Sequence, residues 1–264
     1  MKTYTNPIYA YKRSPDQDSP PPRRPVVVVG AGPVGLAAAI DLAQRDVPVV
    51  VLDEDDTVSV GSRAICYSKR ALEILDRLGC AERIVKKGVE WKVGRVFFRG
   101  EQVYSFDLLP ERGHRRPAFI NLQQYHLEEC LVDRAVELPK AEVRWRNKVV
   151  AVAPSEDDVL LRIATPEGEY ELTCEWLIVC DGSKSPVRSM HFPYSVPMHP
   201  SVLNLVQHRC KSKDGFSVRP RQIRFMSQYF KFPRSDSDQP QLESRFSLRF
   251  SCTIQEYGWP HYVG

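Results

Sequence analysis

Three glycines follow a run of valines near the start of the chain. Residues 26–29 are all valine, and Gly30, Gly32 and Gly35 come next in the string GAGPVG. Between a strand and a helix, the first glycine of this spacing permits a tight turn, the second lets backbone approach a pyrophosphate, and the third lets the helix pack closely on the strand. The phosphates would meet free N–H groups at the helix N-terminus. The spacing predicts a dinucleotide site, although a tight turn alone remains an alternative.

An acidic residue follows where such a site needs one. Asp53 ends the apolar run VPVVVLD, eighteen residues after Gly35. A carboxylate there can accept hydrogen bonds from the ribose of an adenosine. Glu54, Asp55 and Asp56 follow directly, so a solvated acidic loop is the alternative reading for any one of them. By register we prefer Asp53 to Glu54.

A parallel sheet must hold these residues in place. Residues 26–29 predict a strand buried on both faces, and residues 32–46 predict the helix that follows it, with apolar residues at helical spacing. Residues 47–53 then close a strand–helix–strand unit. A further helix is expected over residues 68–78, with Gly79 as its C-terminal stop.

The remaining elements alternate between strands and one more helix. Residues 93–108 alternate apolar and polar side chains, which predicts an antiparallel pair outside the main sheet. A helix is expected from about Asn121, which with Gln124 fits a capping box. After residue 139 the pattern predicts strands within residues 142–154, 158–166 and 169–182, with a turn at Glu167 and Gly168.

Four strings together resemble one known family, the flavin-dependent aromatic hydroxylases typified by para-hydroxybenzoate hydroxylase and 3-(3-hydroxyphenyl)propionate hydroxylase. They are GAGPVGLAAAIDLAQRDVPVVVLD, VGSRAICYSKRALEILDRLGC, NLQQYHLEECLV and LIVCDGSKSPVR. The resemblance implies that Arg63 contacts the flavin side chain, with an ordinary surface arginine as the alternative. It selects Gln124 as a second contact, with helix capping as the alternative.

The fourth string resembles the family's Asp-Gly motif, which serves both FAD and the pyridine nucleotide. Asp181, Gly182 and Arg188 would supply a ribose acceptor, a close backbone approach and a phosphate partner. Lys184 and Cys180 depart from the residues usual in the family without removing the motif. The full expected set of cofactor-binding residues is Gly30, Gly32, Pro33, Gly35, Asp53, Glu54, Arg63, Gln124, Val149, Asp181, Gly182 and Arg188.

The expected fold class is therefore α/β, a Rossmann-like FAD-binding domain with a parallel sheet and an antiparallel β excursion. We expect a flexible leader over residues 1–24, the FAD-binding domain over residues 25–190 with the excursion at 91–118, and an atypical tail of unknown structure over residues 191–264. The tail contains no Gly-Asp dipeptide, which the family uses for a later flavin contact. We therefore expect the C-terminal substrate domain to be truncated or aberrant.

The resemblance implies an FAD-dependent monooxygenase that hydroxylates a phenolic or related aromatic compound with NAD(P)H and O2. The alternative is a non-catalytic FAD-binding remnant of such an enzyme; an NAD-dependent dehydrogenase would leave the Asp-Gly string and the Arg63 string unexplained. No residue is assigned a catalytic role. Tyr104, His114 and Arg116 lie in the excursion that could face a substrate, but each is expected to be an ordinary surface or packing residue.

Composition and charge argue against several other classes of protein. Residues 191–264 hold ten lysines and arginines against five aspartates and glutamates, and the rest of the chain holds 27 against 28. The net charge of +4 therefore comes from the tail, and we expect no nucleic-acid partner. Seven scattered cysteines predict reduced thiols and no metal site. No apolar run approaches the ~20 residues of a membrane helix, and a cytoplasmic location is expected. The oligomeric state is left open.

Overall fold

The valine-rich runs of the sequence form neighbouring strands of one sheet. The structure, a computed structural model, describes residues 4–18, 22–61, 64–155, 157–191 and 206–209. Four parallel strands lie in the order β8–β2–β1–β11. Their bounds are Ala141–Arg144, Val49–Leu52, Arg23–Val29 and Gly168–Val179, respectively. The chain leaves β1 toward β2 on one side and returns to β11 on the other, and ligands of such sheets bind at that switch point.

One face of the parallel strands is covered by an antiparallel meander. It is built from β9 (Lys148–Pro154), β10 (Val159–Thr165) and the first half of β11. Leu161 and Leu172 of the meander share a buried apolar cluster with Val27 and Val50 of the parallel strands. A short helix, α5 (Pro186–His191), follows β11. The last residues of β11 pair antiparallel with β12 (Val206–Arg209).

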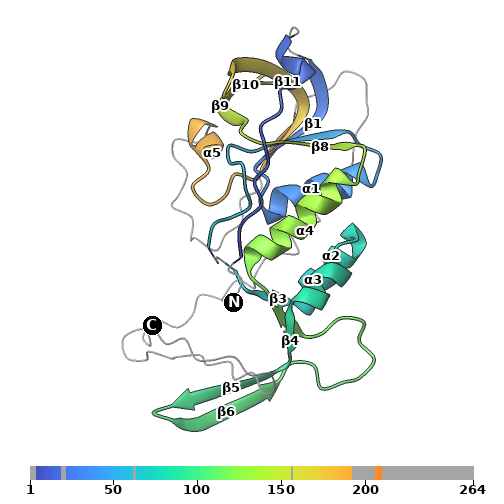
Figure 1. The fold of residues 1–264 in the computed structure, drawn as a ribbon, viewed down its shortest axis with the longest axis vertical. Coiled ribbons are helices and arrows are strands. Elements are labelled where there is room, and N and C mark those ends of the chain that lie inside the picture. The colour runs from blue at the N-terminus through green and yellow to red at the C-terminus, as the bar shows by residue number, and fades with distance from the viewer. Residues whose placement is uncertain (1–3, 19–21, 62–63, 156, 192–205, 210–264) are drawn as a thin grey trace.

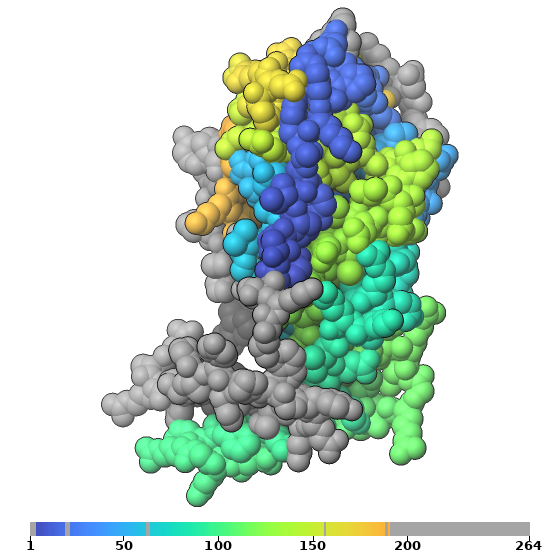
Figure 2. Space-filling model, viewed as in Figure 1, coloured from blue at the N-terminus to red at the C-terminus, as the bar shows by residue number. Residues whose placement is uncertain are grey.

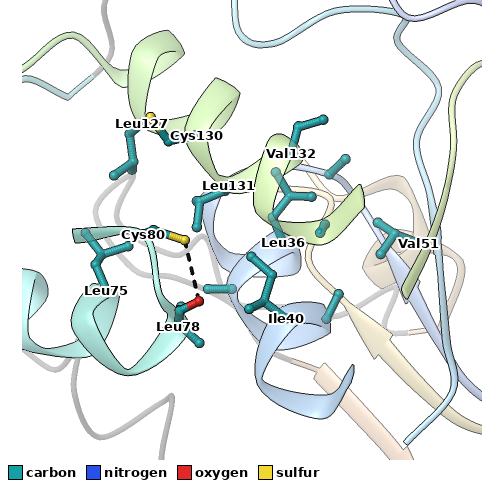
Figure 3. Packing of buried hydrophobic residues seen from close by; sticks show 14 of the residues in the cluster. Leu36, Ile40, Val51, Leu75, Leu78, Cys80, Leu127, Cys130, Leu131 and Val132 are labelled. Atoms are coloured by element: carbon teal, nitrogen blue, oxygen red, sulfur yellow. Dashed lines mark hydrogen bonds between the residues drawn. The ribbon is translucent and has the colours of Figure 1, made fainter. Parts of the chain in front are cut away.

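Helices α1 (Pro33–Ala43) and α4 (Gln124–Val136) cover the opposite face. α2 (Lys69–Leu78) packs against α1, and α3 (Ala81–Lys87) packs against α2 and α4. Figure 3 shows Leu36 and Ile40 of α1 meeting Leu131 of α4, beside Leu75 and Leu78 of α2. Each fully buried side chain of this size contributes about 1.5–3 kcal/mol to folding, so this cluster fixes α4 against the helix that follows the glycine loop.

The excursion forms two smaller sheets. Strands β3 (Cys66–Ser68), β7 (Phe119–Asn121) and β4 (Val89–Trp91) pair antiparallel in that order. Strands β5 (Val93–Phe98) and β6 (Glu101–Asp107) form the expected hairpin, which extends away from the main sheet in Figure 1. The expected antiparallel excursion is therefore confirmed.

Helix boundaries were predicted unevenly. α2 begins after Ser68, whose hydroxyl accepts from the Ala71 N–H at 3.4 Å, and ends at Gly79 with φ of 81°, as expected. The capping box at Asn121 is wrong. Asn121 ends β7 and accepts a hydrogen bond from the Trp91 indole at 2.8 Å, so α4 starts three residues later, after Gln123.

The N-terminal segment, residues 4–18, differs from the expected flexible leader because it lies on the domain. Figure 2 shows it in dark blue across the surface beside the green residues of α4. Tyr9 stacks on Trp145 with ring centroids 4.4 Å apart, and Ile8 forms a β-bridge with Thr57. A short 3-10 helix, η1 (Pro15–Asp18), places Asp16 against Arg144 at 2.7 Å. Tyrosines and one buried carboxylate thus hold a segment that is poor in aliphatic residues.

Candidate cofactor site

The glycine loop lies at the carboxyl ends of the parallel strands, between β1 and α1. Gly30 has φ of 102°, and a Cβ there would stand 2.5 Å from the carbonyl oxygen of Cys180, which follows β11. A Cβ on Gly35 would collide with the carbonyl oxygen of Gly30. Both glycines are therefore required by the close packing of the turn, the helix and the β11 exit.

Gly32 has a different environment. It is the N-cap residue of α1 with φ of −74°, and Pro33 follows it at the first helical position. No heavy atom of the described residues lies within 4 Å of the place a Cβ would take. Among the residues that the structure describes, no side chain caps the first N–H groups of α1. An open approach to uncapped N–H groups is what a pyrophosphate requires.

Asp53 lies directly beside this loop. One carboxylate oxygen accepts the N–H of Ala31, within the glycine string, and the other accepts the N–H of Asp55 at 2.9 Å. Burial raises the pKa of Asp53 to about 6, although these two hydrogen bonds favour the ionised form. A carboxylate oxygen has more than one acceptor position, so Asp53 can bind the loop and still accept a ribose hydroxyl.

Glu54 is placed differently. Its side chain is exposed, and its carboxylate forms an ion pair, 2.8 Å long, with the ammonium group of Lys148, the first residue of β9. This contact fits the solvated acidic loop better than a ribose contact. The structure thus gives a physical reason for the preference for Asp53.

The Asp-Gly string follows β11 at the same edge of the sheet. A carboxylate oxygen of Asp181 accepts the N–H of Val187 at 3.2 Å, and Gly182 has φ of 89° in an exposed turn. Arg188 lies within α5, and its side chain is outside the described residues. Since Cys180 packs against Gly30, this turn and the glycine loop are neighbours.

Gln124 is the first residue of α4 and joins a buried hydrogen-bond cluster. Its amide nitrogen donates to Glu128 at 2.6 Å and to the Ser59 hydroxyl at 3.4 Å. Ser59 and Glu128 were not among the expected site residues, although Glu128 stands in the quoted string one helical turn after Gln124. Arg63 lies outside the described residues.

Val149 differs from the other expected contacts. Its side chain is buried in the apolar cluster between the meander and the parallel strands. Only its backbone could reach a cofactor.

The three polar residues noted in the excursion occupy ordinary positions. The guanidinium of Arg116 is buried and pairs with Asp76 of α2 and with Glu82 of α3 at 2.6 Å. Tyr104 is 61% exposed, and His114 lies 4.0 Å from Glu111. Arg116 therefore ties the excursion to the helices.

The described part of the chain contains no group of three His, Cys, Asp or Glu residues arranged to hold a metal ion. None of its helices is both long and apolar enough to cross a membrane.

The fold and the loop geometry define a dinucleotide-binding α/β domain. The chain belongs to the FAD binding domain family, which it matches over residues 23–245. Within that family, it is similar to flavin-dependent aromatic monooxygenases over its N-terminal part.

Three relatives illustrate the similarity. Para-nitrophenol 4-monooxygenase of Pseudomonas sp. (strain WBC-3) is 32% identical over 62% of this chain and 41% of its own length. 6-Methylpretetramide 4-monooxygenase of Streptomyces rimosus is 33% identical over 66% of this chain and 30% of its own length. The crystal structure of p-nitrophenol 4-monooxygenase PnpA from Pseudomonas putida DLL-E4 matches with a TM-score of 0.61 and 32% identity, over 64% of this chain and 44% of that one. The chain thus spans less than half the length of these relatives.

The residues at the switch point fit FAD. Gly32 leaves open space at the N-terminus of α1, where a pyrophosphate would fit, and the carboxylate of Asp53 lies next to it, where a ribose would need an acceptor. The flavin-dependent monooxygenase PieE, solved in complex with FAD and substrate, matches this chain with a TM-score of 0.57 and 27% identity, over 64% of this chain and 32% of that one. The family and the local geometry therefore agree on the class of cofactor.

Proposed function

We propose that this chain is the FAD-binding part of a monooxygenase that hydroxylates a phenolic or related aromatic compound, with NAD(P)H as reductant. The observation that carries the proposal is the start of α1 at Gly32, which is open and without a side-chain cap in the described part of the chain, with the Asp53 carboxylate beside it. The aromatic substrate class comes from relatives such as para-nitrophenol 4-monooxygenase.

The proposed contacts follow the order of the chain. Gly30 and Gly35 shape the loop, and Gly32 leaves an open surface for the pyrophosphate at the start of α1. Pro33, which has no N–H of its own, begins the helix at its first position beside that surface. Asp53 accepts from the adenosine ribose, with Glu54 at the edge of that site. Further contacts are proposed for Arg63, Gln124, the backbone of Val149, Asp181, Gly182 and Arg188.

The protein's own contribution would be to bind and to orient. Bound FAD supplies electron transfer from NAD(P)H and the activation of O2. In the described residues we assign no acid, base or nucleophile to the reaction. The groups at the switch point would hold the adenosine and pyrophosphate part, which leaves the rest of the flavin to be oriented by Gln124, Arg63 and the Asp-Gly turn.

The test is a turnover assay on purified protein reconstituted with FAD. NADH or NADPH oxidation is followed with and without p-nitrophenol and other phenols, and products are identified by mass spectrometry. The proposal expects faster oxidation of one reductant in the presence of a phenol, with one oxygen atom added to the ring. Bound FAD without any hydroxylated product, across a broad set of phenols, would contradict it.

That second outcome corresponds to another candidate function, an FAD-binding unit that does not hydroxylate by itself. It is favoured by the match to only 41% of the length of para-nitrophenol 4-monooxygenase. The lack of a Gly-Asp dipeptide supports it further. Flavin reduction by NAD(P)H that no phenol accelerates would identify this case.

A further inference from the structure

Glu128 is a buried acidic residue on α4 with three hydrogen bonds. Only 3% of the surface of Glu128 is exposed to solvent. One oxygen accepts the Ser59 N–H at 2.6 Å and the Ser59 hydroxyl at 2.5 Å, and the other accepts the Gln124 amide at 2.6 Å. Over the described ranges, no lysine, arginine or histidine forms an ion pair with it. Burying a carboxyl group is costly, so packing alone does not explain this residue.

The hydrogen bonds of Glu128 set the orientation of the Gln124 amide. The carboxyl oxygen that faces Gln124 accepts, so the amide must present its nitrogen to Glu128. The second hydrogen of that nitrogen points to the Ser59 hydroxyl. The carbonyl oxygen of Gln124 is then the group left to bind elsewhere, and no described residue donates to it. Gln124 thus offers an acceptor to a hydroxyl group.

The same carboxyl group holds the loop that follows Asp53. Ser59 stands six residues after Asp53 and four before Arg63. Its backbone and its side chain both donate to Glu128, which fixes the middle of the loop to the second turn of α4. Glu128 therefore links two of the chain's expected FAD-contacting segments through one buried group.

We infer that Glu128 is a positioning residue of the cofactor site. It holds the Gln124 amide so that the carbonyl oxygen accepts from a hydroxyl of the FAD ribityl chain, and it keeps the Ser59 loop in register. This inference rests on the proposed FAD-binding function, since it concerns how that cofactor is oriented. Glu128 acts through Gln124 and Ser59 and does not itself touch the cofactor.

The informative variant is Glu128→Gln, which keeps the size of the side chain. Its carbonyl oxygen can still accept from Ser59, but its amide nitrogen now faces the amide nitrogen of Gln124. Gln124 must turn over to accept, and then presents a donor where an acceptor is required. Loss of one hydrogen bond predicts an FAD dissociation constant raised about tenfold. The Glu129→Gln variant removes a carboxylate at the next position and should leave FAD affinity unchanged.

A double-mutant cycle separates positioning from a purely structural role. In a Gln124→Ala background, where no amide remains to be oriented, Glu128→Gln should change the FAD dissociation constant by less than about twofold. The dissociation constants come from flavin fluorescence titration, and a thermal melt of each variant without FAD reports folding. An equal fold-change in both backgrounds would overturn the inference.

Failure of this inference and failure of the proposed function look different. Wild-type protein that cannot be reconstituted with FAD would remove both. Wild-type protein that binds FAD, together with a Glu128→Gln variant of equal affinity, would remove the inference alone.

Discussion

At the residue scale, the glycines after β1 serve two purposes. Gly30 and Gly35 are glycine because the folded chain leaves no room for a Cβ. Gly32 has an ordinary φ of −74° and open space around it, so folding does not require a glycine there. A requirement for glycine at this position would come from a ligand.

Gly32→Val should therefore separate ligand binding from folding. The backbone of the free chain accepts a valine at this φ, so we expect a melting temperature close to that of wild type. The added side chain would stand between the pyrophosphate and the helix N-terminus, and FAD retention should be lost. Flavin absorbance after gel filtration, with a thermal melt, measures both; unchanged flavin content would contradict the site.

Gly35→Ala provides the opposite case. The new Cβ would collide with the carbonyl oxygen of Gly30, so the turn or the helix must shift. We expect a loss of about 2–4 kcal/mol in the free energy of unfolding, measured by urea denaturation without FAD. A variant as stable as wild type would show that α1 and the loop pack less closely than described.

Asp53 predicts how FAD affinity depends on pH. Burial raises the pKa of this carboxyl group to about 6, so it is protonated in the free protein below that pH. A ribose hydroxyl prefers the ionised acceptor. The FAD dissociation constant should be constant above about pH 7 and rise by up to about tenfold per pH unit below pH 6. In Asp53→Asn, titrated in the same buffers, we expect weaker binding whose pH dependence is flat; a slope like that of wild type would assign the effect to another group.

At the element scale, the N-terminal segment is fastened by one buried carboxylate. Asp16 accepts from Arg24 at 2.5 Å and from Arg144 at 2.7 Å, and both Asp16 and Arg144 are 5% exposed. Burial raises the pKa of Asp16, but hydrogen bonds from the two arginines outweigh it, and the pKa lies below the ordinary value. Its contribution to stability is present above about pH 4 and is lost as the pH falls through that lowered pKa.

Asp16→Ala should accordingly destabilise the domain at neutral pH. Arg144 would lose one of its acidic partners in a buried position, for which we expect about 3 kcal/mol in the free energy of unfolding. Asp18→Ala is the matched control, because Asp18 pairs with Arg13 on the exposed surface and should have little effect. Equal melting curves for Asp16→Ala and wild type at pH 7 would mean that the segment does not stabilise the domain.

The sequence predicted the elements that carry strong periodicity. The valine runs, the meander and the end of α2 at Gly79 are local patterns, and all were found. α3 was missed because its seven residues span only about two turns, too few for the spacing of Ala81 and Ile84 to stand out as a helical pattern. The start of α4 was misplaced because Asn121 pairs with Trp91 across β7 and β4, a contact that local spacing does not reveal.

The same distinction applies to the site: residues with a local spacing were predicted, and residues that meet only in the folded chain were not. The glycines and Asp53 have a spacing that points to their chemistry, whereas Ser59 and Glu128 meet only after the chain has folded. Cys180 was noted as a departure from the family, but its carbonyl oxygen proves to be the atom that makes Gly30 necessary. Contacts between residues far apart in the chain account for most of what the sequence did not show.

At the scale of the whole molecule, the described elements form the cofactor half of the fold. The switch point, the helices and the meander belong to the FAD binding domain family, and the match to para-nitrophenol 4-monooxygenase spans 41% of that protein's length. FAD binding and hydroxylation can therefore be tested separately. The first depends on residues placed in this structure, and the second also on how an aromatic substrate is held.

The most direct measurement is the equilibrium binding of FAD to the purified chain. Apoprotein is titrated with FAD while flavin fluorescence and the absorption spectrum are recorded, with Gly32→Val in parallel. We predict saturable binding of one FAD per chain, with a shifted flavin spectrum, and no binding to the variant. A well-folded wild-type chain that neither contains nor takes up FAD would contradict it.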